Sequence, residues 1–125
     1  MILRRFGSYK VNIEGETVKN TFYRKVLCTV PGKMQLVMMN LRPTEEIGME
    51  IHHHTSQFFR IESGTGIAIV GNKKYRLKDG DCVIVPPGTR HNIINTSKEN
   101  ELKLYTIYSP PEHEPGEKEK YRKEH

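Results

Sequence analysis

The stretch "GDCVIVPPGTRHNIIN", residues 80–95, contains two short predicted strands and the turn between them. The first strand, "CVIV" (82–85), is a fully apolar run bounded by turn residues. "PPG" (86–88) ends it, because proline cannot donate to a strand ladder and glycine tolerates the turn that follows. The second strand, "HNIIN" (91–95), begins with a histidine. The alternation of a strand places His91, Ile93 and Asn95 on the same face. If that face is the inner one, His91 points into the open end of a barrel.

The same period of two extends over most of the chain. Short runs rich in Val, Ile, Phe and Tyr alternate with turn residues, and Asp79-Gly80 is a strong hairpin signal. No window of a dozen residues shows a convincing helical repeat. The predicted strands are residues 22–30, 34–41, 57–63, 66–71, 73–77, 82–85, 91–95 and 101–109. Many short strands at near-regular spacing predict an all-β fold, either a sandwich or a closed barrel.

The length of 125 residues predicts one domain with one core. We place this domain at residues 1–111, with the barrel at about 30–109. The last stretch, residues 112–125, has many alternating charges and only Tyr121 to bury. It cannot cover a core of its own, so we expect a flexible tail, or an arm that lies over the surface or over a partner.

Charge and hydropathy exclude several partner classes. The net charge is +5, but the basic excess lies in residues 1–33 and is not interleaved with stacking aromatics, which argues against nucleic acid. No run approaches the roughly 18 apolar residues of a membrane span, and the first residues lack the apolar run of a secretory signal. Cys28 and Cys82 lie in strand-like runs and are expected to be buried thiols in a reducing compartment, which favours the cytoplasm.

Residues 80–95 fit the pattern G-x5-P-x-G-x2-H-x3-N, which resembles the second signature motif of the cupin superfamily. "HHHTSQFFRIESGTG" resembles the first motif, which runs H-x-H, three or four residues, E, six residues and G. His52 and His54 satisfy H-x-H in this alignment, and Gln57, with six residues between it and Gly64, replaces the glutamate. Only two residues separate His54 from Gln57, so the alignment requires a shortened turn.

The resemblance covers roughly residues 9–115 and is strongest to a group of small single-domain cupins often labelled sugar-phosphate isomerase-like. It implies an RmlC-like jelly roll, or β-barrel, with both motifs at its mouth. It also implies a homodimer paired through exposed strands. Phe58, predicted to point outward from its strand, is the expected contact, since an exposed aromatic on a sheet face favours a partner.

Two imidazoles that lie two residues apart on one strand can share a metal ion. Period two places His52 and His54 on one face and His53 on the other. With His91 they would form a cap of three nitrogens on a divalent ion, for which Zn, Fe, Mn and Ni are the candidates. Gln57 offers only a neutral amide oxygen as a fourth ligand. The predicted metal ligands are therefore His52, His54, Gln57 and His91.

Because all four predicted ligands are neutral, the ion would keep its double charge and favour an anionic substrate. The competing interpretation is structural: the histidine run is a solvated turn and His91 a hydrogen-bonded barrel residue. No general base can be identified, since Tyr105 and Tyr108 have opposite parity and at most one faces inward. His113 and His125 lie in the charged stretch and are assigned no role.

Three functions remain open. The first is a metal-binding cupin that acts on a small oxygen-rich or anionic metabolite, with isomerase-like chemistry. The second is a non-heme metal dioxygenase, if the ion is iron. The third is a non-catalytic module that binds a small molecule or serves as a dimeric interaction domain. The histidines favour the first two functions, while Gln57 and the missing base favour the third.

Overall fold

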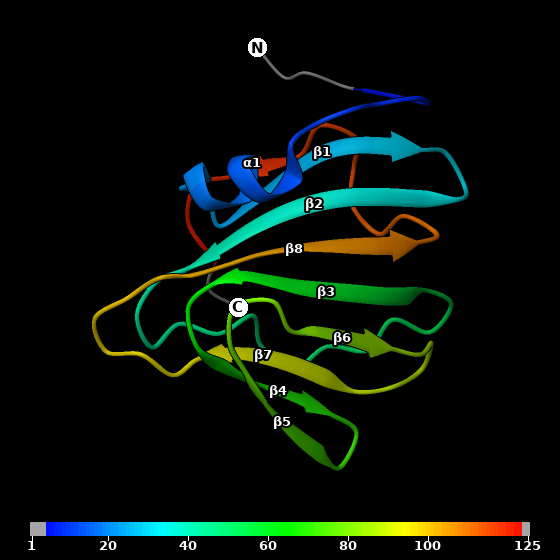
Figure 1. The fold of residues 1–125 in the computed structure, drawn as a ribbon. Helices are drawn as coiled ribbons and strands as arrows, with labels where there is room; N and C mark the ends of the chain where they lie inside the picture. The colour runs from blue at the N-terminus through cyan, green and yellow to red at the C-terminus, as the bar shows by residue number, and fades with distance from the viewer. Residues whose placement is uncertain (1–4, 124–125) are drawn as a thin grey trace.

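A computed structural model describes residues 5–123, whose regular structure is antiparallel sheet and one short helix (Figure 1). All eight predicted strands are present, and their bounds agree with the prediction within two residues. A short ninth strand and a helix were not predicted. The elements are α1 (Ile13–Lys19), β1 (Arg24–Val30), β2 (Met34–Leu41), β3 (Ser56–Ser63), β4 (Gly66–Val70), β5 (Lys73–Leu77), β6 (Cys82–Val85), β7 (His91–Asn95), β8 (Leu102–Ser109) and β9 (Lys118–Glu119).

The strands form two sheets that face each other across one core. The larger sheet has the order β6-β3-β8-β2-β1-β9, and the smaller sheet, drawn below it in Figure 1, has the order β5-β4-β7. Phe59, Ile61 and Leu104 from the large sheet are almost fully buried, as are Ala68 and Ile93 from the small one. This arrangement confirms the predicted all-β fold of the jelly-roll class.

One end of this core is polar. On β3 the buried positions alternate, and the series that starts with Gln57 continues with Phe59 and Ile61. Gln57 lies opposite Tyr108 of β8 in the strand register, and its amide Nε2 donates to Thr106 Oγ1 at 2.9 Å. The inner face of the barrel therefore changes from apolar to hydrogen-bonding towards the start of β3 and the end of β8.

Helix α1 corrects the expectation that no helix is present. Its seven residues are too few to show a 3.6-residue apolar repeat. The signal lies at its start, where the side chain of Asn12 accepts a hydrogen bond from the backbone N–H of Gly15 at 2.9 Å. The helix packs against β8 and β3 and buries Thr17. Capping and tertiary packing, not amphipathic periodicity, define this helix.

The charged C-terminal stretch, of which the structure describes residues 112–123, lies against its own barrel. Its strand β9 pairs with β1, with Arg24 opposite Glu119. Upstream of β9, the side-chain amide of Gln35 donates to the carbonyl of His113 at 2.7 Å and accepts from its backbone N–H at 3.1 Å. This segment therefore adds an edge strand and a hydrogen-bonded strap to the large sheet. The two ends of the predicted domain and tail, residues 1–4 and 124–125, lie outside the described residues.

Both cysteines are free, but only Cys28 is buried. The expectation of a buried thiol is wrong for Cys82, because it begins the edge strand β6 and is exposed to solvent. Within the described part of the chain, no helix has both the length and the apolar character needed to cross a membrane.

Candidate metal centre

Glu50, His52 and His91 each bring one potential ligand atom to a common point, and these atoms lie within 4.8 Å of one another. Glu50 and His52 belong to the segment before β3, and His91 begins β7. A pair of backbone hydrogen bonds joins Glu50 to His91, at 2.9 Å in each direction. The carbonyl of His52 also accepts from the N–H of Gly88, in the turn after β6, at 2.8 Å. Backbone pairing thus brings the two sequence motifs together.

The ring of His91 is held in a defined orientation. Its Nδ1 lies 2.9 Å from the carbonyl oxygen of Thr89, so Nδ1 carries the proton and donates it. Its Nε2 then has a free lone pair, yet this atom is buried and has no hydrogen-bond partner among residues 5–123. A buried polar atom without a partner costs about 1–3 kcal/mol. An ion bound at Nε2 would remove that cost.

His52 lies between two carboxylates. Its Nε2 is 3.0 Å from Glu50 Oε2, and its Nδ1 is 3.5 Å from Glu112 Oε2. The first contact is an ion pair when His52 is protonated, and apart from it the buried Nε2 of His52 has no partner within the described residues. Two ligands at about 2.1 Å from one ion and at a right angle lie about 3.0 Å apart. The spacing of these two atoms fits a shared ion.

The ionisation of the three groups also fits a cation. Burial acts to raise the pKa of Glu50, but its contact with His52 and the charges of His52 and Arg24 outweigh burial and lower it. Burial lowers the pKa of His91 despite its bond to the Thr89 carbonyl. The contact with Glu50 raises the pKa of His52 and outweighs the opposing effect of burial. Glu50 is thus an anion and His91 neutral, as ligands must be, and only His52 has a proton to lose.

Of the four predicted ligands, the structure brings His52 and His91 together and adds Glu50, which was not predicted. The side chain of His54 is exposed and is not part of the group. Gln57 is buried at the polar end of the barrel, where its Oε1 has no hydrogen-bond partner within the described residues. His53 is exposed.

A spacing signal for Glu50 was present in the sequence. Four residues separate His52 from Gln57, and Glu50 precedes His52 by two. The series Glu50-x-His52-x4-Gln57-x6-Gly64 therefore matches the first motif without the shortened turn that His52 and His54 require. Glu50 occupies the position of the first histidine of H-x-H. The histidine triplet masks this signal, because His52 and His54 also fit the H-x-H letters.

Two further residues, Tyr108 and His113, lie beside this group. The Tyr108 ring meets the His52 ring edge-on, with centroids 5.7 Å apart, and its hydroxyl lies 3.2 Å from His113 Nε2. Burial raises the pKa of Tyr108 far above its usual value, so the phenol keeps its proton. Burial also lowers the pKa of His113 to about 4, so this ring is neutral at pH 7. His113 was assigned no role, and it covers Tyr108; His125 lies outside the described residues.

Two histidines and one carboxylate leave coordination positions open on an ion, as catalytic metal sites do. The carboxylate of Glu50 cancels one unit of the charge of a divalent ion, unlike the all-neutral set predicted from the sequence. A bound ion would therefore keep a net single positive charge. Such a centre still favours an anionic or strongly polar oxygen ligand.

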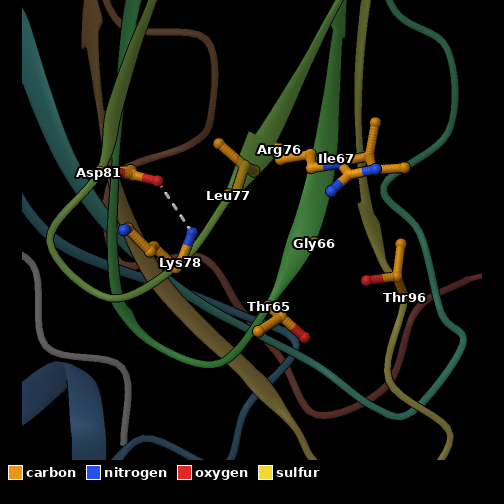
Figure 2. A pocket seen from close by; sticks show the side chains of 8 residues that line it. All are labelled: Thr65, Gly66, Ile67, Arg76, Leu77, Lys78, Asp81 and Thr96. Carbon is orange, nitrogen blue, oxygen red and sulfur yellow. Dashed lines mark hydrogen bonds between the residues drawn. The ribbon is translucent and has the colours of Figure 1, made fainter.

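A hollow of about 590 Å³ lies away from the three grouped side chains (Figure 2). Gly66 and Ile67 of β4 and Arg76 and Leu77 of β5 line part of it, and Lys78 N donates to Asp81 Oδ2 at its side. Gly66 pairs with the last residue of β7, whereas His91 is the first. This hollow is thus at the opposite end of the small sheet and includes none of the three grouped side chains.

Comparison with known proteins gives one consistent picture. The Cupin domain family matches residues 37–108. An uncharacterised protein of Acanthamoeba polyphaga mimivirus is 49% identical over 94% of this chain and 74% of its own length. The protein YrkC of Bacillus subtilis is 42% identical over 90% of this chain, which spans only 64% of YrkC. The crystal structure of BH2720 from Bacillus halodurans superposes with a TM-score of 0.87 at 37% identity, covering 91% of this chain and 89% of that one.

Proposed function

The chain belongs to the cupin family, and we propose that it is a metal-dependent member that acts on a small, oxygen-rich, anionic metabolite. The observation that carries this proposal is the pair of buried Nε2 atoms of His52 and His91. Neither has a hydrogen-bond partner within residues 5–123, and both lie beside an ionised carboxylate. A divalent ion satisfies all three groups at once. Zn, Fe, Mn and Ni are the candidate ions.

The surrounding residues would hold the ligands in place. Glu112 faces Nδ1 of His52, and the Thr89 carbonyl accepts from Nδ1 of His91, so each ring presents Nε2 to the centre. Hydrogen bonds to the far nitrogen orient a metal-bound histidine and raise its basicity. A bound ion would supply a Lewis acid that polarises a substrate oxygen. Tyr108 holds a phenolic proton at this end of the barrel and is the residue best placed to donate it.

Metal content measured by plasma emission on untagged protein tests the proposal. We expect about one equivalent in the wild type and in His54→Ala, whose side chain is exposed, and less than a tenth of that in Glu50→Gln and His91→Ala. Because His54→Ala also removes an imidazole from the histidine run, it is the matched control. Equal metal content in all four proteins would contradict the proposed centre.

A second candidate function is a non-heme dioxygenase. It is favoured by Glu50, because two histidines and one carboxylate with open positions are typical of iron(II) oxygenases. Oxygen uptake by iron-loaded protein in the presence of small hydroxy and keto acids tests this candidate. Uptake with iron and none with zinc would select it over isomerase-like chemistry. Ligand binding without turnover for any loaded metal would select the non-catalytic binding module.

We also propose a homodimer paired through the outer face of the large sheet. Phe58 lies opposite Ile84 of β6 on one side and Ile107 of β8 on the other. The side chain of Ile84 is 65% exposed, although it is aliphatic. Phe58 and Ile107 are half-buried, and an apolar row on the outer face of a sheet is typical of a contact surface. Both free cysteines fit the reducing cytoplasm, where we expect the protein to act.

A further inference from the structure

Arg24, the first residue of β1, is a buried charge near the proposed centre. The residue is only 9% exposed, and its Nη1 lies 3.2 Å from Glu119 Oε1 and 4.0 Å from Glu117 Oε2. Its Nε is buried without a hydrogen-bond partner in the described part of the chain. Both ion pairs of Arg24 use Nη1, and no carboxylate oxygen of residues 5–123 lies within 4.0 Å of its Nε or Nη2. One edge of this guanidinium thus remains available.

Arg24 and Glu50 line the same small cavity, of about 70 Å³. The other lining residues are Tyr23, Ile47, Glu119, Arg122 and Lys123. The cavity exceeds the roughly 10–15 Å³ that one water needs, so it has room for a small polar group such as a carboxylate. The cavity therefore connects a buried guanidinium to a ligand of the proposed centre with space for one small polar group.

The charges that line the cavity balance in favour of an anion. Arg24, Arg122 and Lys123 bring three positive charges, and Glu50 and Glu119 bring two negative ones. The Nε of Arg122 is likewise buried without a hydrogen-bond partner within residues 5–123. An ion bound at Glu50 would add further positive charge. A guanidinium edge binds a carboxylate through two parallel hydrogen bonds, which a lysine cannot reproduce.

We infer that Arg24 binds a carboxylate of the substrate, so that the site takes small carboxylic acids with a second oxygen directed at Glu50, His52 and His91. This inference rests on the proposed function and narrows its substrate class. The competing explanation is that Arg24 only fastens the C-terminal segment through Glu119. The two explanations predict different effects of Glu119→Gln on ligand binding. If Arg24 binds the ligand, Glu119 does not contact it, and its removal leaves binding intact.

Calorimetric titration of the full chain with malonate, and with neutral malonamide as the matched probe, tests the inference. Both the zinc-loaded and the metal-free protein are titrated. The variants are Arg24→Gln, Arg24→Lys and Glu119→Gln. Lys25→Gln is the control, because it removes one positive charge from the adjacent residue, whose Nζ lies over the Phe22 ring. Thermal melts establish that each variant is folded.

We expect wild type and Lys25→Gln to bind malonate and not malonamide. Arg24→Gln should weaken malonate binding by roughly 10- to 100-fold, the usual effect of losing a charged hydrogen bond. Arg24→Lys should weaken it less, because it keeps the charge and loses the planar fork. Glu119→Gln should bind malonate at least as tightly as wild type, since it removes a competing carboxylate.

Three results would overturn the inference: no malonate binding by either form of the wild type, equal binding by wild type and Arg24→Gln, or equal weakening by Arg24→Gln and Glu119→Gln. The proposed function fails separately, if the wild type takes up no metal. Malonate binding by metal-free protein that still depends on Arg24 would then preserve the inference.

Discussion

Replacement of His91 by leucine should separate a metal ligand from a structural histidine. In metal-free protein, His91→Leu removes a buried Nε2 that has no hydrogen-bond partner in the described chain, which favours the variant by about 1–3 kcal/mol. It also removes the hydrogen bond from Nδ1 to the Thr89 carbonyl, which costs about 0.5–1.5 kcal/mol. The two effects nearly cancel. We therefore expect the metal-free variant to be as stable as the metal-free wild type, or slightly more stable.

When metal is bound, the wild type should become more stable than His91→Leu. A ligand at 100 times its Kd stabilises the folded state by about 2.7 kcal/mol. For a domain of this length, each kcal/mol shifts Tm by about 4 °C, so the wild type should gain about 10 °C. His91→Leu should gain little or nothing. Differential scanning calorimetry with and without zinc, after removal of metal by a chelator, measures both effects.

Two results would refute this reasoning. If metal-free His91→Leu lost more than about 3 kcal/mol, the imidazole would stabilise the metal-free fold through contacts or hydrogen bonds that leucine cannot replace. If zinc raised the Tm of the variant as much as that of the wild type, any bound ion would lie elsewhere. In either case, the two orphaned nitrogens would not mark a metal centre.

The geometry supports four further predictions. Glu112→Gln should lower metal affinity about tenfold by releasing Nδ1 of His52, while Glu114→Gln should not; equal affinities in a competition titration would contradict the role of Glu112. The pKa of His52 is raised above 6.5, so its contribution to metal-free stability should be present below pH 6.5 and lost as pH rises through the raised pKa. If urea unfolding of His52→Ala had the same pH profile as that of the wild type, this prediction would be contradicted. Metal uptake should increase over the same rise in pH, as the proton leaves. Ile84→Arg should give a monomer by light scattering, and a persistent dimer would exclude the apolar row as the interface.

Most of the fold could be predicted because its determinants are local. Each strand in residues 34–109 carries its own signal, either alternation or a short apolar run, and turn residues separate it from the next. The elements that were missed depend on distant contacts. Helix α1 is defined by one cap and by packing on β8 and β3, and β9 has only two residues, which pair with β1. No pattern within so short a segment distinguishes it from a loop.

The site was predictable in part. The second motif predicts that His91 begins a strand and points inward, and His91 is the buried first residue of β7. The first motif allowed two alignments, and the histidine triplet favoured the one that needs a shortened turn. Glu50 could have been found from spacing alone. Glu112 and His113 could not, because their contacts with His52 and Tyr108 arise only when the C-terminal segment crosses the barrel.

That crossing has a consequence for how such a protein can change. One segment outside the barrel strands supplies the carboxylate facing His52, the ring that covers Tyr108 and the partner of Arg24. Glu112, His113 and Glu119 are not themselves members of the apolar core. Substitutions at Glu112 and His113 can therefore alter the surroundings of His52 without removing a core side chain, and related chains with different ligands are expected to differ at these two positions.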